Sequence, residues 1–344
     1  MIERKGKKIR LIELVDRLHA TPALRALHDR GRDALTILAY HRVTPIAGPG
    51  RPLDLDLVSA TPESFDWQMA YLREHRHPVS LARALESLRG GEPLPPNAVA
   101  VTFDDGFEDV YRHALPILRR YDIPATVFAI TGNIESGEPF WFERAAFLMA
   151  SLAPGSVRID EIDEALPADG SIAGRVRALG KLHRTLKAVP NERRRQILDG
   201  LARGTATPRD SSRLEIGWPL SWEQVRAMAD QGIEFGSHTV THPNLVKLSE
   251  QDLLWELTES RRVLQERLQR EIISFAYPFG TSQAYDLNVA AAVQRAGFSL
   301  ATSYLPGANW IGAFDRFALR RIGVGLDTSR PQFRVRLALS DWLG

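Results

Sequence analysis

The sequence contains no cysteine among its 344 residues. Disulfide bonds, thiolate metal sites and cysteine nucleophiles are therefore excluded. The sequence also lacks any run of about 18 apolar residues, so we expect no transmembrane helix. The N-terminus has no apolar segment followed by a small-residue cleavage site, which predicts that there is no secretory signal. We therefore expect a cytoplasmic location.

Positive and negative charges are nearly balanced. The sequence has 44 Lys and Arg residues and 42 Asp and Glu residues, which gives a net charge of +2. This balance predicts no nucleic acid or other polyanion as a partner.

Residues 1–34 have a basic start followed by an apolar stripe at helical spacing, which is formed by Leu11, Leu14, Val15 and Leu18. Such an amphipathic helix either docks on its own domain or lies on the inner face of an anionic membrane, and both readings stay open.

Short apolar runs bounded by turn residues predict buried strands. They lie at Leu35–Tyr40, Ala98–Phe103, Ala125–Ile130, Ile233–Gly236, Ile272–Tyr277, Phe298–Thr302 and Leu319–Val324. Helical segments with cap residues, such as Thr61 before Pro62 and Ser221 in S-W-E-Q, separate many of these runs. The alternation predicts parallel βα units, and about seven strands suit a barrel better than an open sheet. No G-x-G-x-x-G follows the early strands, which argues against dinucleotide binding.

The alternation breaks between residues of about 140 and 220, where the sequence is charged and helical in pattern. We expect a barrel over residues 35–330 that contains this helical insertion, and a C-terminal tail over residues 331–344. The insertion is expected to form a cap near the barrel mouth that shapes substrate choice.

Two adjacent carboxylates, Asp104 and Asp105, come directly after the predicted strand Ala98–Phe103. In parallel α/β folds, ligands bind at that end of the strands. Buried acids are costly unless they are paired or bound to a metal. The alternative is a solvated turn with two incidental aspartates.

Two histidines at a spacing common in metal sites, His238 and His242, follow the predicted strand Ile233–Gly236. Two unrelated surface histidines are the alternative. Two imidazoles and one carboxylate, for which we choose Asp105, make a three-ligand site with open positions, as catalytic metals have. Asp104 is then free to be the general base that takes a proton from an acidified water molecule. We expect one divalent ion, zinc first, with cobalt, nickel or iron also compatible.

Three motifs in this order resemble those of one known family. They are T-F-D-D-G at Thr102–Gly106, H-T-V-T-H at His238–His242 and Y-P-F-G at Tyr277–Gly280. The set is similar to the polysaccharide deacetylase family, also called the NodB-homology family or carbohydrate esterase family 4. Y-H-R-V at Tyr40–Val43 resembles a subgroup that includes deacetylases of poly-N-acetylglucosamine. The resemblance covers roughly residues 36–325, apart from the insertion.

The resemblance implies a distorted (β/α)7 barrel of the α/β class and metal-dependent removal of acetyl groups from N-acetylated sugars. Four positions match the family's general base and metal ligands: Asp104 for the base, and Asp105, His238 and His242 for the ligands. The loop of Tyr277, Pro278 and Phe279 matches the oxyanion- and substrate-binding segment. Phe279 would supply the backbone N–H, because Pro278 has none.

Two departures from the family pattern stand out. The position at which the family has an arginine that orients the base is Ala276, so the base must be oriented otherwise or less strongly. No histidine follows His242, although the family's general acid is usually a late histidine. His41, at the end of the first predicted strand, matches the histidine that performs this role in the subgroup. A locally bonded strand-end residue is the alternative for His41.

The leading hypothesis is a hydrolase that removes N-acetyl groups from a sugar, a glycan or a lipid-linked sugar. A second hypothesis is a catalytically weak carbohydrate-binding or scaffold protein that kept the barrel, which the two departures favour slightly. A third is an amidase on a non-sugar amide. Acetate release from a panel of N-acetylated sugars, together with metal content, separates the three.

Overall fold

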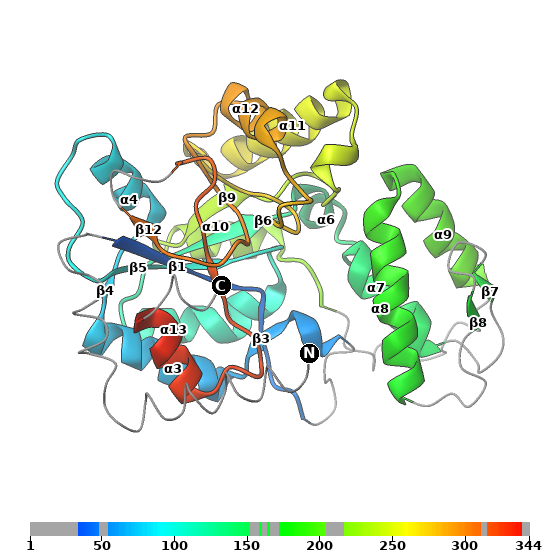
Figure 1. Ribbon diagram of the computed structural model, residues 1–344, viewed down its shortest axis with the longest axis horizontal. Coiled ribbons are helices and arrows are strands. Elements are labelled where there is room, and N and C mark those ends of the chain that lie inside the picture. Colours follow the sequence, from blue (N-terminus) through cyan, green and yellow to red (C-terminus); the bar gives the residue numbers. More distant parts are fainter. Residues whose placement is uncertain are drawn as a thin grey trace.

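The computed structural model describes residues 34–47, 54–151, 158–159, 164–165, 172–203, 217–310 and 315–338. In this part of the chain a curled, mainly parallel sheet is surrounded by helices, and further helices stand to one side of it (Figure 1). The predicted helix in residues 1–34 lies almost wholly outside the described residues, which begin at Ala34.

Each of the seven predicted runs overlaps a strand, and the structure has further short strands. The strands are β1 (Ala34–Tyr40), β2 (Arg42–Val43), β3 (Val58–Ala60), β4 (His77–Pro78), β5 (Ala98–Phe103), β6 (Ala125–Ala129), β7 (Arg158–Ile159), β8 (Glu164–Ala165), β9 (Glu234–Ser237), β10 (Ser274–Ala276), β11 (Leu300–Thr302), β12 (Asn309–Trp310) and β13 (Ile322–Gly323). The main sheet has the order β11-β10-β9-β6-β5-β1-β12, in which β12 is antiparallel to β1. The predicted runs correspond to β1, β5, β6, β9, β10, β11 and β13.

One short segment, residues 319–323, joins the two ends of the sheet. Leu319 forms a parallel bridge to Thr302 of β11, and Ile322 of β13 pairs in parallel with Leu38 of β1. The seven parallel strands therefore close into a ring, and the predicted (β/α)7 barrel is confirmed. The irregular pairing at the closure is what makes the barrel distorted.

Two of the helices, α3 (Pro62–His75) and α10 (Trp222–Ala229), begin at the cap residues that the sequence indicated. The further helices are α4 (Leu81–Leu88), α5 (Leu115–Arg120), α6 (Thr131–Ser136), α7 (Trp141–Ser151), α8 (Ile172–Ala188), α9 (Asn191–Arg203), α11 (Glu250–Leu268), α12 (Leu287–Arg295) and α13 (Arg330–Ala338). Thr61 caps α3 with Pro62 in the first turn, and Ser221 forms a capping box with Gln224 at α10. A π-helical turn precedes α5, which has Pro116 near its start.

Side chains alternate between two cores along each strand, as a period of two requires. On β5, Val99 and Val101 join the large core between the sheet and the helices. Ala98 and Ala100 belong to a second cluster, which includes Leu81 of α4. The second cluster consists of small and aliphatic side chains and Phe128, and α4 packs against them.

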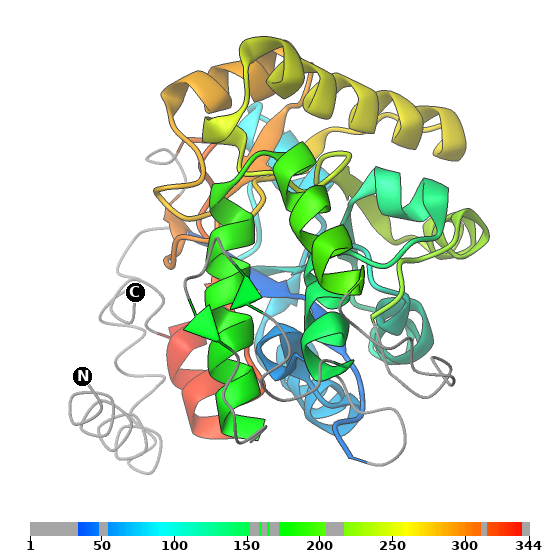
Figure 2. The ribbon, with the colours of Figure 1, turned by 90° about the vertical axis from the view of Figure 1, so that its right-hand side faces the viewer.

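The helical insertion packs largely on itself. Buried side chains of α7, α8 and α9, among them Leu148, Leu182 and Leu198, form a cluster separate from the barrel cores. Figure 2 views the molecule from the side on which these helices, in green, stand in front of the barrel.

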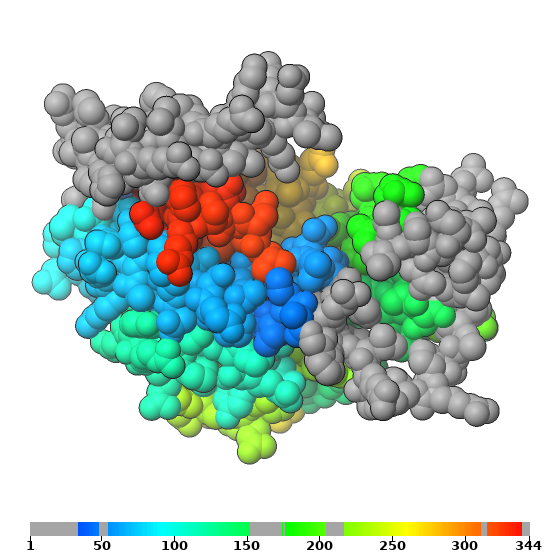
Figure 3. All heavy atoms as spheres, turned by 90° about the horizontal axis from the view of Figure 1, so that it is seen from below, coloured from blue at the N-terminus to red at the C-terminus, as the bar shows by residue number. Residues whose placement is uncertain are grey.

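The segment expected to be a C-terminal tail is instead partly helical. Helix α13 buries Phe333, whose ring packs edge-on against Trp67 of α3. Figure 3 shows α13, in red, against the surface formed by the early part of the chain, in blue. The apolar face of α13 is the physical reason for the difference, since exposing it would be unfavourable.

Among the described residues, no helix has the length and apolar character needed to cross a bilayer.

Candidate active site

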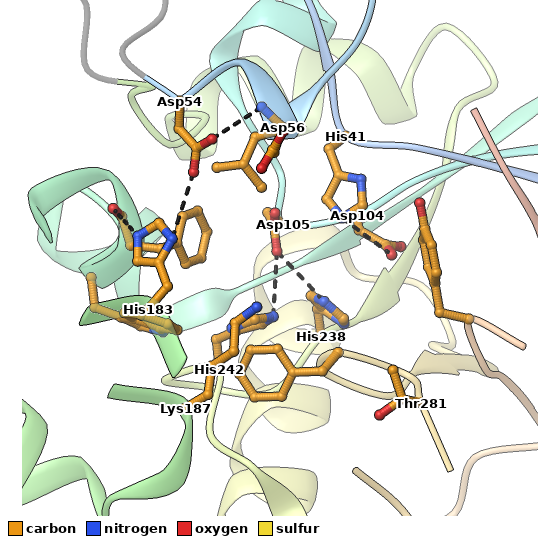
Figure 4. Close-up of a pocket in the computed structure, with 15 residues that line it drawn as sticks. His41, Asp54, Asp56, Asp104, Asp105, His183, Lys187, His238, His242 and Thr281 are labelled. Carbon is orange, nitrogen blue, oxygen red and sulfur yellow. Dashed lines mark hydrogen bonds and ion pairs between the residues drawn. The ribbon is translucent and has the colours of Figure 1, made fainter. Parts of the chain in front are cut away.

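The ends of four parallel strands meet at one mouth of the barrel and bring the candidate residues together (Figure 4). His41 follows β1, Asp104 follows β5, and Tyr40 pairs in register with Phe103 directly before them. His238 follows β9, and Phe279 lies in the loop after β10. All four residues line one cavity of about 330 Å³.

Three buried side chains, Asp105, His238 and His242, point at one another. Their potential ligand atoms all lie within 4.8 Å of one another. Asp105 Oδ1 is 3.5 Å from His238 Nε2 and 3.6 Å from His242 Nε2. This oxygen is buried and accepts no hydrogen bond. A divalent ion would satisfy it, so the donor set fits the expected metal.

The two histidines are held in the form that binds metals. His238 Nδ1 lies 2.8 Å from the carbonyl oxygen of Ala276 and donates to it, which leaves Nε2 with its lone pair toward Asp105. Burial lowers the pKa of His238 to about 4 and the pKa of His242 well below its usual range. Both imidazoles are therefore neutral near pH 7, as ligation requires.

The candidate base Asp104 is oriented by Arg321, a residue that the sequence analysis did not single out. Arg321 donates from Nη1 to Asp104 Oδ1 at 2.7 Å and from Nη2 to Oδ2 at 2.8 Å, and its Nε donates to the carbonyl oxygen of Ser303. Burial is the largest influence on the pKa of Asp104 and would raise it, but Arg321, together with His238 and His41, outweighs burial and lowers that pKa to about 2. The candidate base is therefore held ionised and oriented despite Ala276.

His41 lies on the same side of the mouth as Asp104. Its Nε2 is 4.0 Å from Asp104 Oδ2, and its ring contacts that of Tyr304 at a centroid distance of 5.8 Å. The backbone N–H of His41 donates to Ser59 Oγ, while its side chain faces the cavity. Burial lowers the pKa of His41, and the Asp104 carboxylate offsets part of this shift.

The Y-P-F-G loop contributes Phe279 to the cavity, but its first two residues lie elsewhere. Tyr277 is buried in the core, where its hydroxyl donates to the carbonyl oxygen of Phe317. Neither Tyr277 nor Pro278 is among the residues that line the cavity, and the expectation that they contact substrate stays a prediction. Tyr277 supports the loop, because its ring stacks on that of Tyr285.

Backbone geometry explains the glycine that ends this loop. Gly280 has φ +55°, and a Cβ there would come within 2.4 Å of the backbone nitrogen of Tyr304. Phe279 itself also has a positive φ, of +63°. The chain therefore turns tightly here and brings Phe279 beside His242, at a ring-centroid distance of 4.7 Å.

Further residues of the cavity wall had no signal in the sequence. They come from the helical insertion and from the segment before β3, and they include Trp141, Phe142, His183, Lys187, Asp54 and Asp56. Lys187 of α8 places Nζ 5.1 Å from the centroid of the Phe279 ring, and in Figure 4 its side chain reaches toward the group of Asp105, His238 and His242. The insertion thus forms part of the site, although it packs as a separate cluster.

A protein-family model for polysaccharide deacetylases matches residues 91–301. The chain belongs to this family. The match includes both aspartates and both histidines of the candidate site, and it confirms the resemblance noted in the sequence.

Two solved deacetylases have the same fold. PplD of Streptococcus pyogenes, in complex with acetate, has a TM-score of 0.60 at 21% identity and covers 89% of this chain and 99% of its own. IcaB from Ammonifex degensii has a TM-score of 0.56 at 22% identity and covers 90% of this chain and 97% of its own. At these identities the similarity establishes the NodB-type fold.

A curated relative shares a shorter stretch of sequence. The poly-β-1,6-N-acetyl-D-glucosamine N-deacetylase of Escherichia coli K12 is 40% identical over 97 residues, which is 28% of this chain. The match covers 14% of that relative's length.

Proposed function

We propose that the protein is a metal-dependent hydrolase that removes N-acetyl groups from the sugar units of a glycan. The observation that carries the proposal is the convergence of Asp105, His238 and His242 beside Asp104 in one cavity. Family membership supports the chemistry, and the name of the E. coli relative supports an N-acetylglucosamine polymer as the substrate class.

Asp105, His238 and His242 would hold one divalent ion, zinc in ordinary preparations, although the donor set also accepts cobalt, nickel or iron. When bound, the ion supplies Lewis acidity and makes water acidic enough to ionise near neutral pH. Asp104 takes the proton from the attacking water, and Arg321 keeps its carboxylate ionised and aimed at the mouth.

The reaction breaks the C–N bond of the acetamide, so water supplies a hydroxyl to the acetate and a proton to the amine. The backbone N–H of Phe279 stabilises the negative charge that develops on the acetyl oxygen. His41 gives a proton to the departing nitrogen, because an amine leaves readily only when it is protonated. Its position on the Asp104 side of the cavity supports this assignment.

The location of the protein decides which substrates it meets. We propose a cytoplasmic protein. Contact of residues 1–34 with the inner face of the membrane also stays a proposal, because the structure describes only Ala34 of this segment. In that compartment a lipid-linked or nucleotide-linked N-acetyl sugar is the alternative to a polymer.

The test is acetate release by the metal-loaded protein from oligomers of β-1,6-linked N-acetylglucosamine, a nucleotide-linked N-acetyl sugar and a non-sugar acetamide. Release from the oligomers, lost after chelation and restored by added metal, is expected. Turnover of the non-sugar amide alone would favour an amidase. Stoichiometric metal without any turnover would favour a binding or scaffold role.

A further inference from the structure

A buried arginine of the insertion, Arg194 in α9, contacts the loop of residues 239–242, which ends in the proposed metal ligand His242. Its side chain is 4% exposed. Among the residues that the structure describes, no carboxylate forms a direct ion pair with its guanidinium, although Glu256 of α11 acts on it electrostatically from farther away. Its Nε is buried without a hydrogen-bond partner. A buried charge without a direct ion pair is unfavourable, so its position calls for another explanation.

The contacts of Arg194 converge on the loop that holds His242. Nη1 donates to the carbonyl oxygen of His242 at 3.1 Å, and Nη2 donates to Asn191 Oδ1 at 2.5 Å. Asn191 in turn donates to Thr241 Oγ1 at 2.6 Å. The guanidinium lies 4.6 Å from the centroid of the Trp141 ring, in cation–π contact. The first turns of α9 are thus bonded to two consecutive residues of the loop.

This loop has an unfavourable backbone conformation that neighbouring elements must hold. Thr239 and His242 have φ values of +72° and +55°, which non-glycine residues rarely adopt. Glu256 of α11 fixes the middle of the loop by accepting from the N–H of Val240 at 2.7 Å and of Thr241 at 3.0 Å. Arg194 fixes its end, and it does so from the insertion.

The two histidine ligands are oriented in different ways. His238 has the usual support, a hydrogen bond from Nδ1 to a backbone carbonyl. His242 Nδ1 is buried and has no hydrogen-bond partner. The orientation of His242 therefore depends on its backbone and on the rings packed around it, including Phe142 at a centroid distance of 5.5 Å.

We propose that Arg194 is a positioning residue for His242, which makes the helical insertion a structural part of the metal site. This inference rests on the proposed role of His242 as a ligand. Loss of the guanidinium frees the carbonyl end of the loop and lets the imidazole leave its position opposite Asp105. Loss of such supporting contacts typically weakens metal binding by about 10- to 100-fold.

The experiment measures the affinity of the metal-free protein for Zn²⁺ by chelator competition, and the visible absorption spectrum of the Co²⁺-loaded protein. Arg194→Met should bind Zn²⁺ about 10- to 100-fold more weakly and shift the Co²⁺ bands. Arg195→Met is the matched control, because Arg195 lies next along α9, is exposed and pairs with Glu192. It should behave as the wild type does.

A second variant guards against simple misfolding. Arg194→Lys keeps the positive charge and most of the aliphatic stem, but it cannot donate to His242 and Asn191 in one fork. It should also weaken Zn²⁺ binding and shift the Co²⁺ bands. Wild-type affinity and spectrum in either folded variant would overturn the inference. Full metal retention in His242→Ala would instead overturn the proposed function, so the two failures are distinguishable.

Discussion

The Arg321 guanidinium meets the Asp104 carboxylate through two hydrogen bonds, although 217 positions separate the residues in the sequence. Arg321 is 1% exposed, and its guanidinium also lies over the ring of Phe128 at 5.7 Å. An arginine that orients Asp104 is thus present not at position 276 but directly before β13. The alanine at position 276 therefore no longer supports the hypothesis of a catalytically weak scaffold protein.

Replacing Arg321 by Met should destabilise the fold by about 3 to 5 kcal/mol, because it leaves a buried carboxylate without its partner. The pH dependence follows from the pKa of Asp104. In the folded wild type this pKa is lowered to about 2, whereas in the unfolded chain an aspartate has a pKa of about 3.9. The ion pair therefore stabilises the fold fully at pH values above about 3.9, and this stabilisation is lost as the pH falls toward 2. The stability difference between the two proteins should therefore grow as pH rises from 3 to 7.

Urea unfolding of the metal-free proteins across this pH range measures the difference. Arg320→Met is the control, since Arg320 is exposed and its side chain donates to the carbonyl oxygen of Pro306. A difference that does not change with pH would mean that Arg321 acts through packing alone.

Asp104 and Asp105 should respond differently to the same substitution. Asp104→Asn should keep the metal and cut turnover by about 10²- to 10⁴-fold, the usual contribution of a general base. Asp105→Asn should lose the metal, because its orphaned Oδ1 is the oxygen between the two histidines. Metal content and turnover measured on both variants check this. The opposite pattern would exchange the two roles.

His41→Ala should retain metal and stability yet lose about 10²- to 10⁴-fold in amide turnover. An activated aryl acetate should be affected much less, because its leaving group needs no proton. Parallel kinetics on an N-acetyl sugar and the aryl ester make the comparison. Equal losses on both substrates would assign His41 to structure or substrate binding, and full amide activity would remove it from the mechanism.

Lys187 should bias the enzyme toward substrates with a negative group, because its ammonium reaches into the cavity beside Phe279. Lys187→Met should lower kcat/KM for a nucleotide-linked N-acetyl sugar relative to a neutral oligomer by about two- to fivefold, as expected for an exposed charge pair. Arg184→Met, an exposed change on the same helix, is the control. An unchanged ratio would show that this part of the insertion does not select by charge.

Sequence patterns predicted the local elements well, because their causes are local. The apolar run before Asp104 became β5 with the predicted bounds, and Ser221 with Gln224 formed the predicted capping box. The motif residues met at one mouth because parallel strand ends must do so. Arg321 could not be assigned, since its partner is set by how the barrel closes. Lys187 resembled any other lysine on a charged helix.

The segment that carries Arg321 is also the segment that closes the barrel, between Thr302 and Leu38. A chain growing on the ribosome therefore exposes its aspartates and both loop histidines before the guanidinium that completes the base has been synthesised. Under the proposed mechanism, hydrolysis begins only when residues 319–323 have left the ribosome and inserted into the barrel. A nascent deacetylase of this design would therefore stay inactive until that segment has been synthesised.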